Sequence, residues 1–328
     1  MSKTYQVVGI GNAVVDVITN ADDATLDQLG IEKGIMQLVE QERGEFLYDA
    51  MQKRIQTPGG SVANTLAGLG NLGLKTGFIG RVHDDALGQF YAEEMVRGGT
   101  DYVNDPVAGG ELPTSRSMIF VSPDGERSMN TYLGISSEIS ADDVPASVAE
   151  DAEIMFLEGY LYDKPQGKHA FDQAARLTKA AGGQVGISLS DPFCVDRHRD
   201  DFRKFVKELD FVIGNEHEWE SLYQSDLSTA LETAASECGL VVCTRSSGDV
   251  VIVRGDEEVI VPVTRITPVD TTGAGDQFAA GFLYGLSSGE SLAVAGRMGC
   301  VAASEVISHV GPRPETDLKA LFAKEGLV

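Results

Sequence analysis

Residues 267–286, TPVDTTGAGDQFAAGFLYGL, place one carboxylate, Asp276, where a glycine-rich turn runs into an apolar helical stretch. Gly273, Ala274 and Gly275 can direct backbone N–H groups toward one point, and the positive end of the following helix adds to them. Such a turn forms an anion hole. A carboxylate beside it is suited to accept a proton from a hydroxyl that attacks phosphorus. The alternative is that Asp276 only caps the helix. Residues 273–276 alone do not favour either interpretation over the other.

A second polar stretch, PGGSVAN at residues 58–64, precedes a predicted helix over 61–72. Gly59 and Gly60 allow a ligand to approach the backbone closely. Asn64 falls in the first turn of that helix, and its amide both donates to and accepts from a sugar hydroxyl. The alternative is a loop that simply starts a helix.

The stretch GIGNAVVD at residues 9–16 follows a predicted strand and resembles the start of a dinucleotide-binding loop. Val14 stands where the third glycine of that motif belongs, so we reject this interpretation. Asp16 lies within an apolar run, residues 13–18, where an unpaired buried charge would be costly. We expect its carboxylate to accept hydrogen bonds from a vicinal diol, or else to face solvent by simple strand alternation.

Two further motifs follow predicted strands later in the chain. Asn215 and Glu218 have the spacing of a capping box, and the functional alternative gives Glu218 a water-mediated hold on Mg²⁺ near a nucleotide. The loop 244–248, TRSSG, ends the strand 240–243, at the sheet edge where parallel-sheet proteins bind ligands.

The composition excludes several classes of function. The formal net charge is −24, so nucleic acid and an acidic membrane surface are unexpected partners. The four cysteines form no CxxC pair, which argues against disulfide staples and structural zinc. No P-loop, HExxH or GxSxG motif occurs, and no signal segment or membrane-length apolar run is visible. We therefore expect a cytoplasmic protein.

Strands and helices alternate from residue 150 onward, which predicts a doubly wound, mainly parallel sheet flanked by helices. The turn SPDG at residues 122–125 predicts a hairpin of strands 117–121 and 127–133. This hairpin departs from the alternation. We expect one continuous unit, residues 1–328, in which segments of about 12–40 and 110–135 build a small β-sheet lid on the α/β domain.

Taken together, these motifs resemble the ribokinase-like carbohydrate kinase (PfkB) family, adenosine kinase-like branch. The resemblance runs from Gly9 to about Pro312. Its specific blocks are PGGSVANTLAGLGNLG at residues 58–73 and DTTGAGDQFAAGF at residues 270–282, with the Asn215–Glu218 motif between them. It implies an α/β domain with a β lid, and transfer of the γ-phosphoryl group of ATP to a primary hydroxyl.

The resemblance also implies roles for individual residues. Asp276 is then the catalytic base, and Gly273, Ala274 and Gly275 form the anion hole. The residues implied to bind substrate are Asn12, Asp16, Gly59, Gly60 and Asn64. Those implied on the nucleotide side are Asn215, Thr244, Arg245, Gly248, His309 and Gly311. Glu218 is expected to hold Mg²⁺ through water, and Asp270 matches a position associated with a monovalent cation, K⁺, in some members.

The GNAVVD, GGSVANT and PDGERSMNTYLG stretches favour adenosine as the substrate, giving AMP. Ribokinase, inosine–guanosine kinase, fructokinase and 2-keto-3-deoxygluconate kinase activities remain open, as does a catalytically silent ligand sensor. Met118, Phe120 and Met129 are candidates for an apolar wall against a purine, with core packing as the alternative. The expected partners are ATP and a small sugar or nucleoside, and the chain is expected to be a monomer or homodimer.

Overall fold

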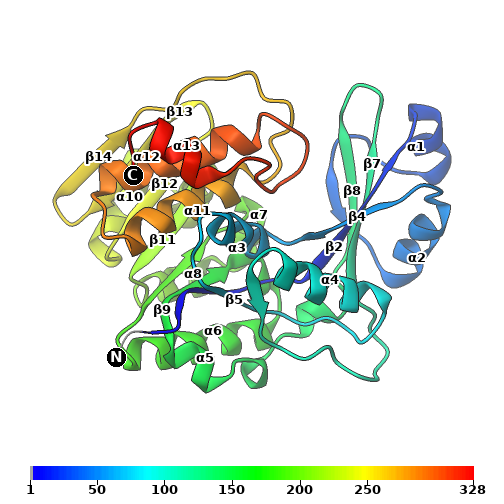
Figure 1. The fold of residues 1–328 in the computed structure, drawn as a ribbon, viewed down its shortest axis with the longest axis horizontal. Coiled ribbons are helices and arrows are strands. Elements are labelled where there is room, and N and C mark those ends of the chain that lie inside the picture. The colour runs from blue at the N-terminus through cyan, green and yellow to red at the C-terminus, as the bar shows by residue number, and fades with distance from the viewer. Residues whose placement is uncertain (1–2) are drawn as a thin grey trace.

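The computed structural model describes residues 3–328, which form two β-sheets (Figure 1). The larger sheet has nine strands in the order β14-β13-β12-β11-β10-β9-β1-β5-β6. In this spatial order, all neighbouring strands from β12 through to β6 are parallel. Strands β13 and β14 add an antiparallel hairpin at the other edge, beside β12. The strands are β1 (Tyr5–Ile10), β5 (Thr76–Ile79), β6 (Thr100–Tyr102), β9 (Ala152–Glu158), β10 (Gln184–Ser188), β11 (Phe211–Asn215), β12 (Val241–Arg245), β13 (Gly248–Arg254) and β14 (Glu257–Val261).

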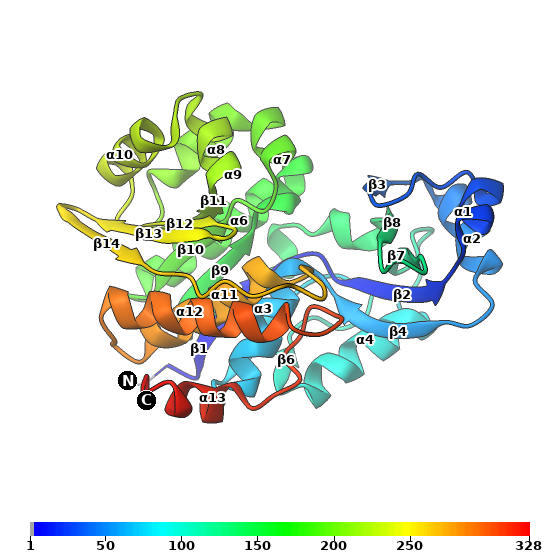
Figure 2. The same ribbon diagram turned by 90° about the horizontal axis from the view of Figure 1, so that it is seen from above.

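Helices cover both faces of this sheet, so its central strands are apolar on both sides. In β1, for example, Val7 faces one core and Val8 the other, and both are fully buried. One face carries α3 (Ser61–Asn71), α4 (Ala86–Arg97), α11 (Ala274–Ser287), α12 (Leu292–Val306) and α13 (Leu318–Lys324). The other carries α5 (Ala146–Glu150), α6 (Pro165–Ala180), α7 (Pro192–Arg197), α8 (Arg199–Val206), α9 (Glu216–Tyr223) and α10 (Leu227–Glu237). Figure 2 shows the two helical layers on either side of the strands. The predicted doubly wound α/β fold is confirmed.

The smaller sheet projects from one side of the α/β body (Figures 1 and 2). Its five strands have the order β3-β8-β7-β2-β4, and we call this sheet the lid. The strands are β2 (Val14–Asn20), β3 (Met36–Leu38), β4 (Ile55–Gly59), β7 (Ser115–Val121) and β8 (Arg127–Tyr132), with α1 (Asp23–Leu29) and α2 (Gln41–Ala50) between them in sequence. The hairpin expected at residues 122–125 is present as β7 and β8.

Strand β4 and helices α1 and α2 are not among the predicted elements. Pro58 and Gly59 read as helix-breaking loop residues, yet they pair with β2 as part of β4. Because β4 is an edge strand, the missing N–H of Pro58 breaks no sheet hydrogen bond. Asp22 caps α1 by accepting from the Thr25 backbone N–H at 2.8 Å, a short-range signal that the strand-like reading of 12–40 overlooks.

The order of the large sheet reverses direction beside β1. From β1 the chain proceeds outward through β5 and β6, and from β9 it proceeds the opposite way through β10, β11 and β12. In open α/β sheets, ligands bind beyond the carboxyl ends of the strands at such a switch point. The residues that follow β1 and end β9 are therefore expected at the centre of a site.

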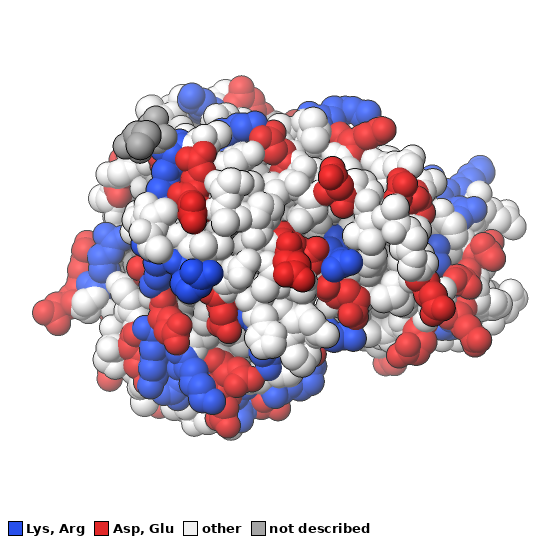
Figure 3. Space-filling model, turned by 90° about the horizontal axis from the view of Figure 1, so that it is seen from below, with Lys and Arg blue, Asp and Glu red and all other residues white. Residues whose placement is uncertain are grey.

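Acidic and basic side chains are interspersed on the face of the molecule that Figure 3 shows. Within residues 3–328, no helix is both long and apolar enough to cross a membrane.

Candidate active site

A cavity of about 730 Å³ lies between the lid and the carboxyl ends of the large sheet. Strands β9, β10 and β11 contribute their last residues to it, Glu158, Ser188 and Asn215, and β12 contributes Thr244, one residue before its end. The first turns of α3 and α11 open into the same cavity. Two helix N-termini with free N–H groups therefore face one space, which favours a negatively charged ligand.

Asp276 lies in the first turn of α11 but does not cap it. The N-cap residue is Gly273, and no side chain caps this helix. The Asp276 carboxylate instead accepts hydrogen bonds from Ser61 Oγ at 2.7 Å and Asn64 Nδ2 at 3.1 Å, both in the first turn of α3. Of the two readings of this residue, the structure therefore excludes the capping one.

The environment of Asp276 suits a general base. Burial raises its pKa to about 6, while the hydrogen bonds from Ser61 and Asn64 and the charge of Arg313 pull the pKa down. A base works best when its pKa lies near the operating pH. Asp276 is then mostly ionised at neutral pH and still able to hold a proton once it has accepted one.

The glycine turn before α11 has the conformation that an anion hole needs. Gly273 has φ of +78°, and a Cβ there would approach Pro312 to 2.6 Å, so only glycine fits. A Cβ on Gly275 would meet nothing within 4 Å, because this residue faces the cavity. The Ala274 N–H already donates to Thr271 at 3.3 Å, which leaves the N–H groups of Gly275 and Asp276 as the freer donors of this turn.

Asp16 presents an open carboxylate to the cavity. Its side chain lines the cavity wall, and within residues 3–328 no group donates a hydrogen bond to it. Burial raises its pKa to about 6, and Arg127 and Arg313 lower it. Gly59 makes room for this carboxylate, since a Cβ there would lie 2.6 Å from it. A half-buried acceptor without a partner is what a ligand with paired hydroxyls requires.

Gly60 and Asn12 hold the chain where β1 meets α3. Gly60 has φ of +98°, and a Cβ would lie 2.2 Å from the Asn12 carbonyl oxygen, so glycine is required. Asn12 is buried, and its amide donates to Glu158 Oε1 at 2.8 Å and accepts from Ser136 Oγ at 3.0 Å. These two residues thus lie at the switch point of the sheet, beside the cavity.

Glu158 is a site residue that the sequence motifs did not reveal. Its carboxylate accepts from the Asn12 backbone N–H at 3.1 Å and from the Val62 N–H at 3.1 Å, as well as from the Asn12 amide. Burial raises its pKa to about 7, and these hydrogen bonds lower it. The one available signal was a lone acid ending the apolar strand predicted at 154–157.

Asn215 and Glu218 form the capping box that their spacing predicts. Asn215 Oδ1 accepts from the Glu218 N–H at 3.0 Å, and Glu218 Oε2 accepts from the Asn215 N–H at 2.7 Å. Glu218 Oε1 also accepts from the Asn215 amide, so each carboxylate oxygen accepts one hydrogen bond and keeps a further lone pair. Burial raises the Glu218 pKa to about 7. Both residues nevertheless line the cavity, as does Thr244. The structural reading of this pair is thus established, while its hold on Mg²⁺ stays a prediction.

Four of the predicted nucleotide-side residues do not line this cavity: Arg245, Gly248, His309 and Gly311. Arg245 lies 3.7 Å from Glu216 and lines a separate cavity of about 370 Å³. Gly248 pairs with Arg245 where β13 begins, and His309 lies 3.3 Å from Glu305 Oε2. Their role in nucleotide binding stays a prediction.

Asp270 is saturated by protein donors. Its Oδ2 accepts from Arg127 Nη1 at 2.7 Å and from the Gly311 N–H at 2.9 Å, and its Oδ1 accepts from Thr272 N and Oγ1. Arg127 comes from lid strand β8, and both members of this ion pair are only 10% exposed. A guanidinium therefore occupies the place beside this carboxylate. The monovalent cation finds no free oxygen there and stays a prediction.

The comparisons with known proteins agree with this geometry. Residues 35–318 match the pfkB family of carbohydrate kinases. The chain belongs to this family. It is therefore an ATP-dependent carbohydrate or nucleoside kinase.

Two solved structures resemble this pfkB-family kinase over nearly their whole lengths. A probable sugar kinase from Rhizobium etli is 42% identical, with a TM-score of 0.91 over 99% of this chain and 100% of that one. An adenosine kinase from Sinorhizobium meliloti is also 42% identical, with a TM-score of 0.90 over 98% and 99%. A 5-dehydro-2-deoxygluconokinase from Shouchella clausii is 28% identical over 76% of this chain and 80% of its own.

Apolar and aromatic side chains form part of the cavity wall in this kinase. From the lid come Met36, Leu38 and Met129, and from the α/β body come Tyr160 and Phe193. Phe193 is 74% exposed, an unusual position for a phenylalanine. Of the three candidates for an apolar wall, only Met129 lines the cavity. Met118 and Phe120 are at most 1% exposed and belong to the lid core, as the alternative reading held.

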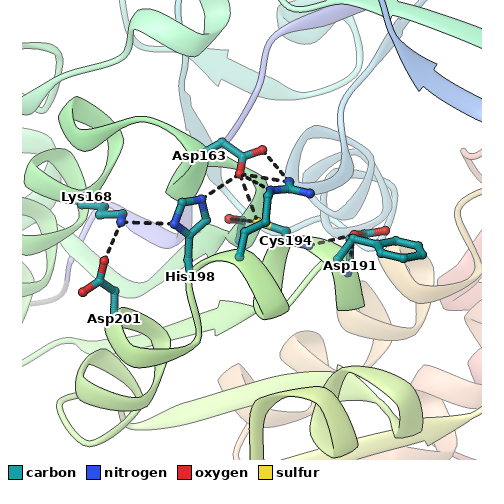
Figure 4. Close-up of polar contacts among 9 residues, drawn as sticks. Asp163, Lys168, Asp191, Cys194, His198 and Asp201 are labelled. Carbon is teal, nitrogen blue, oxygen red and sulfur yellow. Dashed lines mark hydrogen bonds and ion pairs between the residues drawn. The ribbon is translucent and has the colours of Figure 1, made fainter.

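A charged cluster lies at the C-terminal end of α7, around Asp163 and His198 (Figure 4). Asp163 accepts from Arg197 Nη2 at 2.9 Å and lies 2.9 Å from His198 Nε2. Lys168 lies 3.5 Å from His198 Nδ1 and donates to Asp201 at 2.6 Å. Arg197 and Asp163 both line the cavity, so this cluster fixes a guanidinium at its wall.

Proposed function

We propose that this kinase transfers the γ-phosphoryl group of ATP to the primary 5′-hydroxyl of adenosine, giving AMP and ADP. One observation carries the proposal. The open carboxylate of Asp16 and the activated carboxylate of Asp276 share a cavity whose wall also contains two aromatic residues, Tyr160 and the exposed Phe193. The ribose diol would bind Asp16, and the base would lie against the apolar wall.

The reaction proceeds by in-line displacement. The acceptor oxygen bonds to the γ-phosphorus as its proton passes to Asp276, and the bond from phosphorus to the ADP oxygen breaks. The N–H groups at the start of α11 stabilise the negative charge on the transferring group. Closure of the lid, through Arg127 and Asp270, excludes water that would otherwise take the phosphoryl group.

The residues present fit a magnesium ion that arrives with ATP. Among residues 3–328, no three His, Cys, Asp or Glu side chains are grouped as a metal cage. Mg²⁺ commonly keeps several waters and binds through substrate phosphates, with few protein ligands. Glu218, at the cavity edge, would then hold the ion through water, and the ion would neutralise phosphate charge.

The aromatic wall favours a nucleoside over a free sugar. Tyr160 and Phe193 line the cavity, and a base that stacked on one of these rings would gain about 1–3 kcal/mol. A free pentose has no flat group to use this surface. The name of the Sinorhizobium meliloti relative agrees with this reading.

A screen of ADP release across acceptors tests the proposal. Adenosine, inosine, ribose, fructose and 2-keto-3-deoxygluconate are supplied at equal concentration, with Asp276→Asn as the matched inactive control. We expect the highest kcat/KM for adenosine. In Tyr160→Ala, KM for adenosine should rise about tenfold or more, while any turnover of ribose stays unchanged. A free sugar that outperforms adenosine would overturn the assignment.

A sugar acid or other sugar is the second candidate. Relatives of this chain include a probable sugar kinase and a 5-dehydro-2-deoxygluconokinase. Arg197 at the cavity wall supplies a cation that could bind a sugar carboxylate. Its Nη2 group already donates to both carboxylate oxygens of Asp163. Adding 5-dehydro-2-deoxygluconate to the screen, with wild type and Arg197→Met, distinguishes this candidate. Turnover that depends on Arg197 would favour it.

A further inference from the structure

Arg313 lies in the segment between α12 and α13, beside Asn64 of the site. Its Nε donates to Asn64 Oδ1 at 3.3 Å, and its Nη2 lies 3.7 Å from Met95 Sδ. Among residues 3–328, no carboxylate lies within ion-pair distance of its guanidinium. Arginine stays protonated in proteins, and a packed charge that makes no direct ion pair gains little to offset its lost hydration. This position therefore calls for a reason beyond stability.

The hydrogen bond from Arg313 sets the orientation of the Asn64 amide. Since Asn64 Oδ1 faces the guanidinium, Asn64 Nδ2 must face the other way, toward Asp276 Oδ2 at 3.1 Å. A flipped amide would put its NH₂ group against the guanidinium and its oxygen against the carboxylate. Both contacts would be repulsive. Arg313 thus fixes one of the two donors that hold Asp276, the other being Ser61.

Arg313 also supplies the positive charge that acts on the carboxylates of the site. Its charge lowers the pKa of Asp276 and of Asp16, both of which burial raises to about 6. Arg127 of lid strand β8 acts on Asp16 in the same direction and pairs with Asp270 at 2.7 Å. The remaining titratable groups near these carboxylates are Tyr91 of α4, Glu158 of β9 and Tyr160 beyond it, and Glu94 of α4 acts on Arg313 itself.

We infer that Arg313 is a positioning residue for the phosphoryl-transfer reaction. Through Asn64 it orients the Asp276 carboxylate, and its charge keeps Asp276 and Asp16 ionised at neutral pH. The inference rests on the proposed function, because it assumes that Asp276 accepts the proton and Asp16 the sugar hydroxyls. None of the sequence motifs singled out Arg313.

Two substitutions separate the two roles. Arg313→Lys keeps the charge but loses the planar Nε–H that binds Asn64. Arg313→Gln loses the charge but keeps an N–H donor that can reach Asn64. In Arg313→Lys, we expect kcat/KM to fall about tenfold while the acid limb of its pH profile stays in place. In Arg313→Gln, that limb should move to higher pH by about 1 unit, since a nearby opposite charge commonly shifts a carboxyl pKa by about 1–3 units.

The control is Arg297→Gln, which removes a charge from the neighbouring α12, where Arg297 pairs with Glu325 at 3.2 Å. We expect its pH profile to match that of wild type. An acid limb in Arg313→Gln that also matches wild type would overturn the role of the charge. An Arg313→Lys with full kcat/KM would overturn the role of the Asn64 contact. A lowered melting temperature in both variants, with both kinetic readouts unchanged, would leave only a structural role and so overturn the inference.

A second measurement does not depend on turnover. Carboxyl ¹³C titration of the protein without substrates, with the Asp16 and Asp276 signals assigned from Asp16→Asn and Asp276→Asn, reports each pKa directly. We expect both values to rise in Arg313→Gln and to stay near wild type in Arg313→Lys and Arg297→Gln. If wild type phosphorylates no acceptor, the proposed function fails, yet this titration still decides the charge effect. Unchanged carboxyl pKa values in Arg313→Gln would refute it.

Discussion

Gly275→Ala should make this protein more stable and less active at once. Gly275 is the second residue of α11, and a Cβ added there meets no heavy atom within 4 Å. The methyl group therefore fits without strain. Replacing a helical glycine by alanine stabilises by about 0.5–1 kcal/mol, because glycine loses more backbone freedom on folding. We expect the free energy of unfolding to rise by up to about that amount.

The same methyl group occupies space that the transferring phosphoryl group needs. Gly275 lines the cavity beside Asp276, and its N–H belongs to the free first turn of the helix. A methyl in this space prevents a close approach of the anion to that N–H. A misplacement of about 1 Å can lower the rate of a positioned reaction by about 10²-fold. We therefore expect kcat/KM to fall by about two orders of magnitude.

Urea denaturation and a coupled ADP-release assay measure the two effects on the same samples. The matched control is Gly281→Ala, two turns along α11, where a Cβ would lie 2.4 Å from the Met298 carbonyl oxygen. This control should lose about 1–3 kcal/mol of stability through overpacking and keep its kcat at low temperature. Full activity in Gly275→Ala would refute the placement of the phosphoryl group at this turn, and a loss of its stability would refute the unstrained fit of the methyl group.

Three further predictions concern the carboxylates and the lid. As pH falls through about 6, kcat/KM should fall about tenfold per pH unit because Asp276 takes up a proton, and more steeply if Asp16 must also be ionised. Asp276→Asn should lower kcat by about 10²–10⁴-fold. A wild-type rate that stays constant down to pH 5 would contradict the role of Asp276 as the base. Glu158→Gln should lower the free energy of unfolding by about 1–3 kcal/mol, because the new NH₂ group would face a backbone N–H that now donates to the carboxylate. An unchanged midpoint in urea denaturation would argue against this network. Arg127→Gln and Asp270→Asn should each raise KM, since this pair joins the lid to the body at 2.7 Å. Their double mutant should show a coupling energy of about 1 kcal/mol or more. Strictly additive effects would mean that the contact contributes nothing.

Much of the fold was readable from the sequence because it depends on local patterns. The apolar runs of the parallel strands, the turn at residues 122–125 and the glycine turn before α11 each carry their own signal. Strand β4 was not predicted from the sequence because Pro58 and Gly59 are typical of loops. A strand tolerates them here only because β4 lies at the edge of its sheet. Met118 and Phe120 could not be told from cavity residues, because the direction of a side chain in the lid depends on which face is covered.

The sequence by itself determined that a glycine turn, a helix start and one carboxylate coincide at residues 273–276, and that a second glycine turn precedes Asn64. Only the tertiary structure decided what that carboxylate does. Asp276 binds Ser61, a residue 215 positions away, in place of its own helix end. Glu158 and Arg313 also lie at the site only because of the tertiary fold. The parallel sheet brings strand ends and helix starts from distant parts of the chain to one edge. Local patterns carry no record of such contacts, since hydrogen bonds between remote residues depend on the path of the whole chain.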